Sequence, residues 1–164
     1  MCQLGRNDFA STGVAQGQYG ALVAFPAANK LNLCEFSPID FQPELKTERL
    51  WYVSMGSAQP IVDPFLGLMR KVFWTDGQPN YQEGIFAVTW AIQHAIELNP
   101  GGVNGPLQVA ILTRQKDAYQ ARLLEDTELA EHKNNVDEAI EHLRTYRELL
   151  SGKLNQNISD IPKP

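Results

Sequence analysis

Hydrophobic residues alternate with polar ones, or form short runs, in five places, and each predicts a β-strand. The clearest alternation is "KLNLCEFSP", where Leu31 and Leu33 face one side and Cys34 and Phe36 the other. The run "YGALVAFP" is apolar and stopped by Pro26, which indicates a buried strand. We expect strands at residues 19–26, 30–38, 49–56, 107–114 and 118–125. The first two form a hairpin across "PAAN", and the last two form one across "QKD".

Apolar residues recur every three or four positions in longer stretches, which predicts α-helices from residue 63 to about 73, from about 80 to 98, and from about 127 to 151. The first begins with Asp63 as its cap and Pro64 at its first position. Its apolar face comprises Phe65, Leu68, Met69, Val72 and Phe73. The second is apolar around most of its circumference, so we expect neighbours on several sides. The third, capped by Asp126 and stopped by Gly152, has a buried stripe of Leu129, Val136, Ile140, Leu143 and Leu150.

The segments between these elements read as a connection at residues 38–48, a turn at 75–79 and a glycine-rich loop, "NPGGVNGP", at 99–106. The order is strands, two helices, two strands and a helix. This order predicts an α+β fold, with helices layered on a mostly antiparallel sheet. We expect one domain at residues 19–152, an irregular start at 1–18 and a mobile tail at 153–164.

Composition narrows the class of protein. The 164 residues are 43% hydrophobic and 20% charged, as in one globular domain, and no apolar run is long enough to span a bilayer. A net charge of -5 argues against nucleic acids and anionic membranes as partners. The start lacks the pattern of a signal peptide. The two cysteines, Cys2 and Cys34, have no metal-ligand spacing, so we expect a reducing, cytoplasmic setting.

The stretch "RLWYVSMGSAQP" places Ser57 between a predicted strand and a helix, where several hydrolases hold a nucleophile. The nucleophile-elbow pattern needs glycines two residues before and after the serine, but Met55 and Gln59 stand there. A serine nucleophile also needs a base held by a third group. All three histidines of the chain fall inside predicted helices. These observations argue against a serine triad.

The histidines do not form a metal-binding pattern either, and we expect no metal and no cofactor. His132 and His142 are ten residues apart, which places them on different helix faces; Glu128 and Glu138 precede them by four residues, as in surface helix pairs. His94 reads as a partly buried structural residue. The glycine-rich loop matches no phosphate-binding motif and leads into a strand, so a dinucleotide site is not indicated. From these patterns alone, the chain is a soluble α+β domain with a possible site at the turn near Ser57.

The succession "YGALVAFP…LNLCEFSP…WYVSMGSAQ…DPFLGLMRKVF…GIFAVTWAIQHAIELNPGGVNGPLQVAIL" resembles the later part of a proteasome-type N-terminal nucleophile hydrolase. In that family a strand ends in a Gly-Ser-Gly-like turn, and two helices, a glycine-rich loop, a strand hairpin and a closing helix follow. Gly56 and Ser57 match the turn, with Ala58 where the second glycine is usual. The resemblance covers residues 19–150. It implies part of an αββα four-layer sandwich.

The resemblance also implies a function: peptide-bond hydrolysis by an amino-terminal threonine whose own α-amine is the base, in a bacterial-type protein that self-assembles into rings or related oligomers. Ser57 would then hold the nucleophile's amine in place. Asn99 stands where the family has an aspartate; it can hydrogen-bond but holds no charge. The serine usual in this loop is lost, because its place falls near Val103.

The family's threonine, acid and lysine precede the part that this chain resembles, so we expect no peptidase activity from these residues alone. We also expect an exposed apolar sheet face and an unpaired sheet edge. Cys2 as an alternative nucleophile is disfavoured, because its segment is polar and interrupted by glycine. Three other readings stay open: Gly56 and Ser57 as only a tight connection, a non-catalytic subunit of a proteasome-like oligomer, and a domain that binds a small molecule with its glycine-rich loop.

Overall fold

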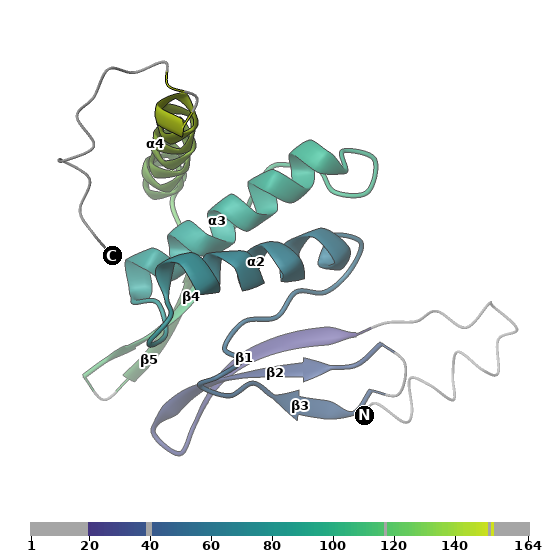
Figure 1. The fold of residues 1–164 in the computed structure, drawn as a ribbon. Coiled ribbons are helices and arrows are strands. Elements are labelled where there is room, and N and C mark those ends of the chain that lie inside the picture. Colours follow the sequence, from purple (N-terminus) through teal and green to yellow (C-terminus); the bar gives the residue numbers. More distant parts are fainter. Residues whose placement is uncertain (1–19, 39–40, 117, 151, 153–164) are drawn as a thin grey trace, which may run out of the picture.

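The computed structural model describes residues 20–38, 41–116, 118–150 and 152. The strands are β1 (Ala21–Ala27), β2 (Lys30–Phe36), β3 (Pro43–Leu45), β4 (Ala110–Gln115) and β5 (Ala118–Leu123). The helices are α2 (Gln59–Phe73), α3 (Tyr81–Leu98) and α4 (Asp126–Leu150). The first three strands form one antiparallel sheet in the order β1-β2-β3, and β4 pairs with β5 in a second (Figure 1). The α+β class is confirmed, and so is the order of the predicted elements except for the third strand.

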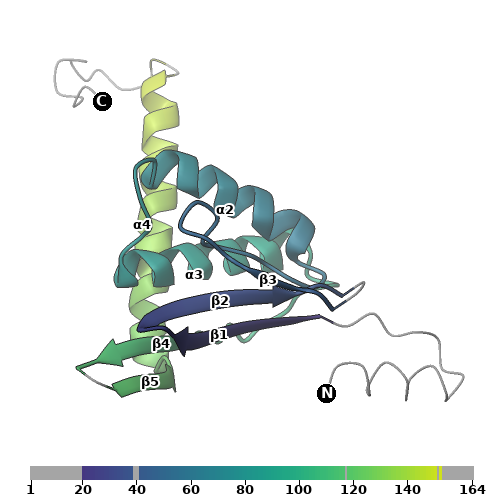
Figure 2. The same ribbon diagram turned by 90° about the horizontal axis from the view of Figure 1, so that it is seen from below.

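The elements lie in a helical part and a sheet part. Helices α2 and α3 lie side by side over the three-stranded sheet, and α4 crosses α3 and continues beyond it (Figures 1 and 2). The β4–β5 hairpin lies beside the turn end of the β1–β2 hairpin (Figure 2). There Arg114 Nη1 donates a hydrogen bond to the carbonyl of Asn29 over 3.3 Å.

The hydrophobic core sits within the helices, not between helices and sheet. Its fully buried members on α3 and α4 include Ala91, Ala95 and Val136. Trp51 and Tyr52, from the irregular segment before α2, pack against this core. In β1, β2 and β3, by contrast, Cys34 is the one buried residue. The three-stranded sheet is therefore covered only thinly by the described residues.

The predicted β1–β2 hairpin is confirmed, but β1 runs through Pro26 instead of stopping there. Ala28 and Asn29 form a two-residue turn with φ of 50° and 61°, the left-handed values that suit a hairpin. Ala27 and Lys30 flank this turn and exchange backbone hydrogen bonds with each other. Farther from the turn, every second pair of opposite residues does the same. Pro26 lies between two such positions and faces away from β2, so its missing N–H removes no bond of the sheet.

The predicted third strand at residues 49–56 is wrong. This segment has no regular secondary structure and pairs with no strand, and β3 lies instead inside the predicted connection at residues 38–48. Trp51 makes an edge-to-face contact with Trp74, with ring centroids 5.9 Å apart, so its ring packs on helices. The backbone N–H of Ser54 donates to the carboxylate of Asp63 and not to another strand. The apolar pattern of residues 49–56 thus places Trp51 on the surface of helices and not in a sheet.

Helix α2 begins five residues earlier than predicted. Its N-cap is Ala58, Pro60 lies in the first turn, and Pro64 is inside the helix. Asp63 is not the cap, because it lies inside the helix; its carboxylate bonds Ser54. The predicted apolar face is largely wrong too. The buried residues are Val62, Leu66 and Met69, whereas Leu68, Val72 and Phe73 are at least half exposed.

Helix α3 agrees with its prediction. Asn80 is the N-cap: its side chain accepts a hydrogen bond from the N–H of Glu83, whose carboxylate accepts one from the N–H of Asn80. Buried residues occupy several faces of the helix, as expected: Ile85, Ala87, Thr89, Trp90, Ala91 and Ala95.

Helix α4 follows its prediction over its first half only. Leu129 and Val136 are buried, but Leu143 and Leu150 are exposed, which corrects the predicted stripe. Asp126 is the first helical residue and not the cap. Gly152 follows the helix with φ of 71°, and its N–H bonds the carbonyl of Leu149, so the predicted stop is confirmed.

The β4–β5 hairpin is confirmed, with pairing from Ala110–Leu123 to Gln115–Ala118. Within the described ranges, no helix combines the length and apolar character needed to cross a bilayer. The irregular start predicted at residues 1–18, the mobile tail at 153–164 and the candidate nucleophile Cys2 lie outside the described residues.

Candidate functional site

Gly56 and Ser57 form the corner at which the irregular segment turns into α2. Gly56 has a φ of 92°, a conformation that side chains disfavour, and its carbonyl accepts a hydrogen bond from the N–H of Gln59. Ser57 is exposed. The backbone conformation at this position thus favours glycine, and the serine that follows lies at the surface.

The Ser57 hydroxyl connects this corner to the glycine-rich loop. Ser57 Oγ donates a hydrogen bond to the carbonyl of Gly102 over 2.7 Å, across 45 positions of sequence. Asn99 ends α3, and its carbonyl accepts hydrogen bonds from the N–H groups of Gly102 and Val103. Gly102 therefore contacts both Ser57 and Asn99. The structure brings the three predicted site residues, Gly56, Ser57 and Asn99, to one end of the α2–α3 layer.

The side chain of Asn99 lies directly over Gly102. A methyl group added at Gly102 would come within 2.5 Å of Asn99 Nδ2, so a larger residue requires the amide to move. Gly102 of the loop is thus contacted by the Asn99 side chain and by the Ser57 hydroxyl.

Asp63 is a member of this corner that sequence reasoning missed. Its Oδ1 accepts hydrogen bonds from both the N–H and the hydroxyl of Ser54, at 2.9 and 2.6 Å. Its Oδ2 accepts a longer one, 3.3 Å, from Gln59 Nε2. The carboxylate ties the segment before Ser57 to the helix after it. The signal in the sequence was a serine and an aspartate nine residues apart, which alone does not separate this contact from a helix cap.

The histidines lie away from the corner's hydrogen bonds. His94 is half-buried and stacks on Phe65, with ring centroids 4.5 Å apart. His132 is buried, so its predicted surface pairing with Glu128 is wrong. Both carboxylate oxygens of Glu128 bond Arg122 instead, at 2.6 and 2.7 Å. Within the described part of the chain, no three His, Cys, Asp or Glu residues are placed to hold a metal ion.

The Arg122–Glu128 pair joins β5 to the first turn of α4. The hydrogen bonds from Arg122, and then that from the N–H of Glu125, lower the pKa of Glu128 to about 2. The bonds to Glu128 outweigh the smaller effect of desolvation and raise the pKa of Arg122. Because both side chains are exposed, we assign them a role in positioning the helix start and little weight in stability.

Lys46, just after β3, is the one lysine of the described residues seen in an ion pair. Its side chain is only 5% exposed, and Nζ lies 2.6 Å from Glu35 and 2.9 Å from Glu44. Desolvation alone would lower its pKa, but the hydrogen bonds and charges of the two glutamates outweigh this and raise it. The group is a stable cation and not a proton acceptor at neutral pH.

Two open cavities lie beside residues 48–51, which precede α2. One, of about 780 Å³, lies between the β1–β2 hairpin and β4; its lining includes Ala24, Leu33, Lys46, Trp51 and Leu112. Its walls come from both sheets.

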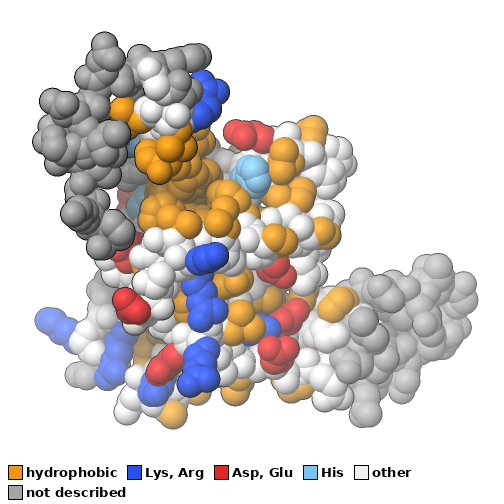
Figure 3. All heavy atoms as spheres, in the orientation of Figure 1, with side chains coloured by type: hydrophobic (Ala, Val, Ile, Leu, Met, Phe, Trp, Pro, Cys, Tyr) orange, Lys and Arg blue, Asp and Glu red, His pale blue; other side chains and the backbone are white. Residues whose placement is uncertain are grey.

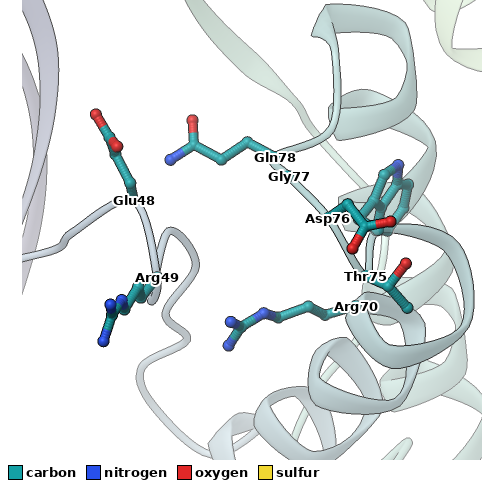
Figure 4. Close-up of a pocket in the computed structure, with 8 residues that line it drawn as sticks. Glu48, Arg49, Arg70, Thr75, Asp76, Gly77 and Gln78 are labelled. Carbon is teal, nitrogen blue, oxygen red and sulfur yellow. The ribbon is translucent and has the colours of Figure 1, made fainter.

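The other cavity, of about 450 Å³, lies at the opposite end of α2 from Ser57 (Figure 4). Arg49 and Arg70 extend along one side of it, and Glu48 and Gln78 face each other on the other. Thr75 supplies its one hydroxyl, with no histidine or cysteine among the described residues that line it. Its mixed charges suit binding better than nucleophilic chemistry.

Comparison of the chain with models of protein families, with curated proteins and with solved structures gave no match. The geometry of the Ser57 corner therefore carries the functional argument.

Proposed function

We propose that this chain is the later part of a proteasome-type N-terminal nucleophile hydrolase, which hydrolyses peptide bonds with a nucleophile contributed from outside these residues. The observation that carries the proposal is the hydrogen bond between Ser57 and Gly102. In the resembling family the corner serine and the glycine-rich loop border the nucleophile together. The bond supports such a shared position for Ser57 and Asn99.

The hydrogen-bond direction at Ser57 fits a supporting role. Its proton goes to a carbonyl, which is not a base, so nothing in this contact activates the hydroxyl for attack. A hydroxyl that donates one bond keeps its lone pairs as acceptors. Ser57 can thus accept a hydrogen bond from a nearby α-amine and hold it. Asn99 can orient a neighbour through its amide but cannot take up a proton.

The exposed sheets support the αββα part of the proposal. Leu22 and Ala24 direct their N–H and C=O groups away from β2, and no described strand pairs with this edge. Leu22, Val23 and Leu31 are partly exposed to solvent. The cavity of about 780 Å³ between the two sheets leaves room for further side chains. Additional strands and a second helix layer would cover these surfaces.

The first test is a peptidase assay on the 164-residue chain. We expect no turnover of fluorogenic peptides, because the described site holds no activated nucleophile. Turnover abolished by Cys2→Ala or Ser57→Ala would overturn the proposal, since the nucleophile would then lie within this chain.

The second test uses the nucleotides upstream of the Met1 codon. We expect an in-frame extension with a threonine-led strand, followed by an acid and a lysine. The extended protein should hydrolyse peptides, and loss of the threonine should abolish this. Ser57→Ala should lower kcat, on the order of tenfold or more for a group that positions the nucleophile. Thr145→Ala, on the exposed side of α4, is the control and should leave kcat unchanged.

A second candidate is a non-catalytic subunit of a proteasome-like homo-oligomer. The exposed apolar residues of the helices favour it, because surfaces of this kind mark association sites. An upstream stop codon without such a frame, together with oligomers that lack peptidase activity, would support this candidate over the first.

A further inference from the structure

The second half of α4 carries an apolar stripe without a partner among the described residues. Leu129, Val136, Leu143 and Leu150 recur every seven residues along one side of the helix. The first two are buried, Val136 in the core cluster shared with α3. Leu143 and Leu150 are 59% and 72% exposed, and Tyr146 between them is 52% exposed. One continuous apolar stripe is thus buried in its first half and exposed in its second half.

Apolar side chains are exposed on α2 as well: Leu68, Val72 and Phe73 are at least half exposed. Figure 3 shows hydrophobic side chains gathered in a hollow between α4 and the α2–α3 layer. Ala139 and Ile140, in the middle of α4, are partly buried and pack against the core. The hollow has helices on both sides, which suits the insertion of another helix.

Charge distinguishes the two halves of α4. Residues 126–139 contain five acidic residues and one lysine, whereas residues 140–150 contain two acidic residues, Glu141 and Glu148, and two basic ones, Arg144 and Arg147. In a chain of net charge -5, the exposed half is the one without excess charge. Two copies of this half can approach each other without net repulsion.

We propose that the second half of α4 pairs with the same segment of a second copy of this chain, in antiparallel orientation. With Leu143 and Leu150 at the first core position of a heptad, Tyr146 takes the second, and so does Ala139, which lies just before this half and is partly buried. An antiparallel pair then sets Leu143 against the second copy's Tyr146, and the small Ala139 against its Leu150. The stripe is self-complementary in size, and it continues the packing already made with α3.

Sedimentation velocity of the full chain over a wide range of concentrations tests the proposal. We expect a dimer whose dissociation constant rises at least about tenfold in Leu143→Glu, because a charge would enter the centre of the interface. Thr145→Glu, on the opposite side of the helix, is the matched control and should leave the constant unchanged. Leu150→Glu, near the helix end, repeats the test at a position where folding is least affected.

Cross-linking tests the orientation. In a Cys2→Ser background, with Cys34 buried, a mixture of Leu143→Cys and Tyr146→Cys chains should form a disulfide-linked heterodimer. More efficient linkage of Leu143→Cys with itself would overturn the antiparallel arrangement. A wild-type chain that is monomeric throughout, or a dimer unaffected by both glutamate variants, would overturn the proposed interface. The peptidase proposal does not depend on these outcomes and has its own assay.

Discussion

Ala91 and Ala95 of α3 have no exposed surface, whereas Leu31 of β2 and Leu45 of β3 expose about half of theirs. The helical core and the three-stranded sheet both contain many apolar residues. Only in the helical core are the apolar side chains packed closely against one another. Close packing stabilises a fold because it removes apolar area from water and because touching atoms attract each other by dispersion, and the sheets have little of either. This difference indicates that the packing of the helices contributes most of the stability of the fold. The sheets are stabilised mainly by their backbone hydrogen bonds.

The largest expected effect is in the helical core. Met69→Ala should lower the free energy of unfolding by about 2–5 kcal/mol, because a buried side chain is replaced by a cavity. Leu45→Ala in β3 should change it by less than about 0.5 kcal/mol, since the side chain is already in solvent. Urea unfolding of both variants measures the contrast. Equal losses would mean that the sheet is packed as tightly as the helices in solution.

The next effect in size concerns Lys46, which belongs to the sheet part. Lys46→Met should cost about 1–3 kcal/mol, because Glu35 and Glu44 lose their shared partner. The pKa of Lys46 is raised on folding, so its contribution is present below pH 10.5, the ordinary pKa, and is lost as the pH rises through the raised value. Unfolding of both proteins at neutral and strongly alkaline pH tests the sign: the gap between them should close at alkaline pH.

Asp63 fixes the segment before α2 to that helix. Asp63→Ala should cost about 1–3 kcal/mol, because the N–H and hydroxyl of Ser54, a buried residue, would lose their acceptor. Asp76→Ala is the control: its carboxylate lies in an exposed turn and should matter little. If both variants unfold at the same urea concentration as wild type, the corner does not depend on this carboxylate.

The smallest expected effect is the pH dependence from Glu128. Its pKa is lowered on folding to about 2, so the Arg122 pair stabilises above the ordinary pKa of 4.5 and is lost as the pH falls through about 2. Glu128→Gln should therefore differ slightly from wild type at neutral pH and converge with it near pH 2. High salt should also remove the difference, because the pair is exposed. A gap that widens in acid would contradict this sign.

Local patterns determined the existence and order of the main elements. The alternation around Leu31 and Leu33, the Asn80 and Glu83 capping residues, and the glycine at position 152 each act within a few residues of themselves. Interactions between residues so close in the sequence can be recognised from the sequence alone. The hairpins, α3 and the end of α4 were therefore predictable.

Tertiary structure decided which surfaces are buried and which groups meet. The pattern at residues 49–56 suited a strand, but Trp51 found helices as its neighbours, and the stripe of α4 runs past the end of the surface that covers it. Gly56, Ser57 and Asn99 could be named from the chain through a resemblance, whereas the contact of Ser57 with Gly102 spans 45 positions. No local pattern specifies such a contact, because it depends on how two helices and their connections pack in space.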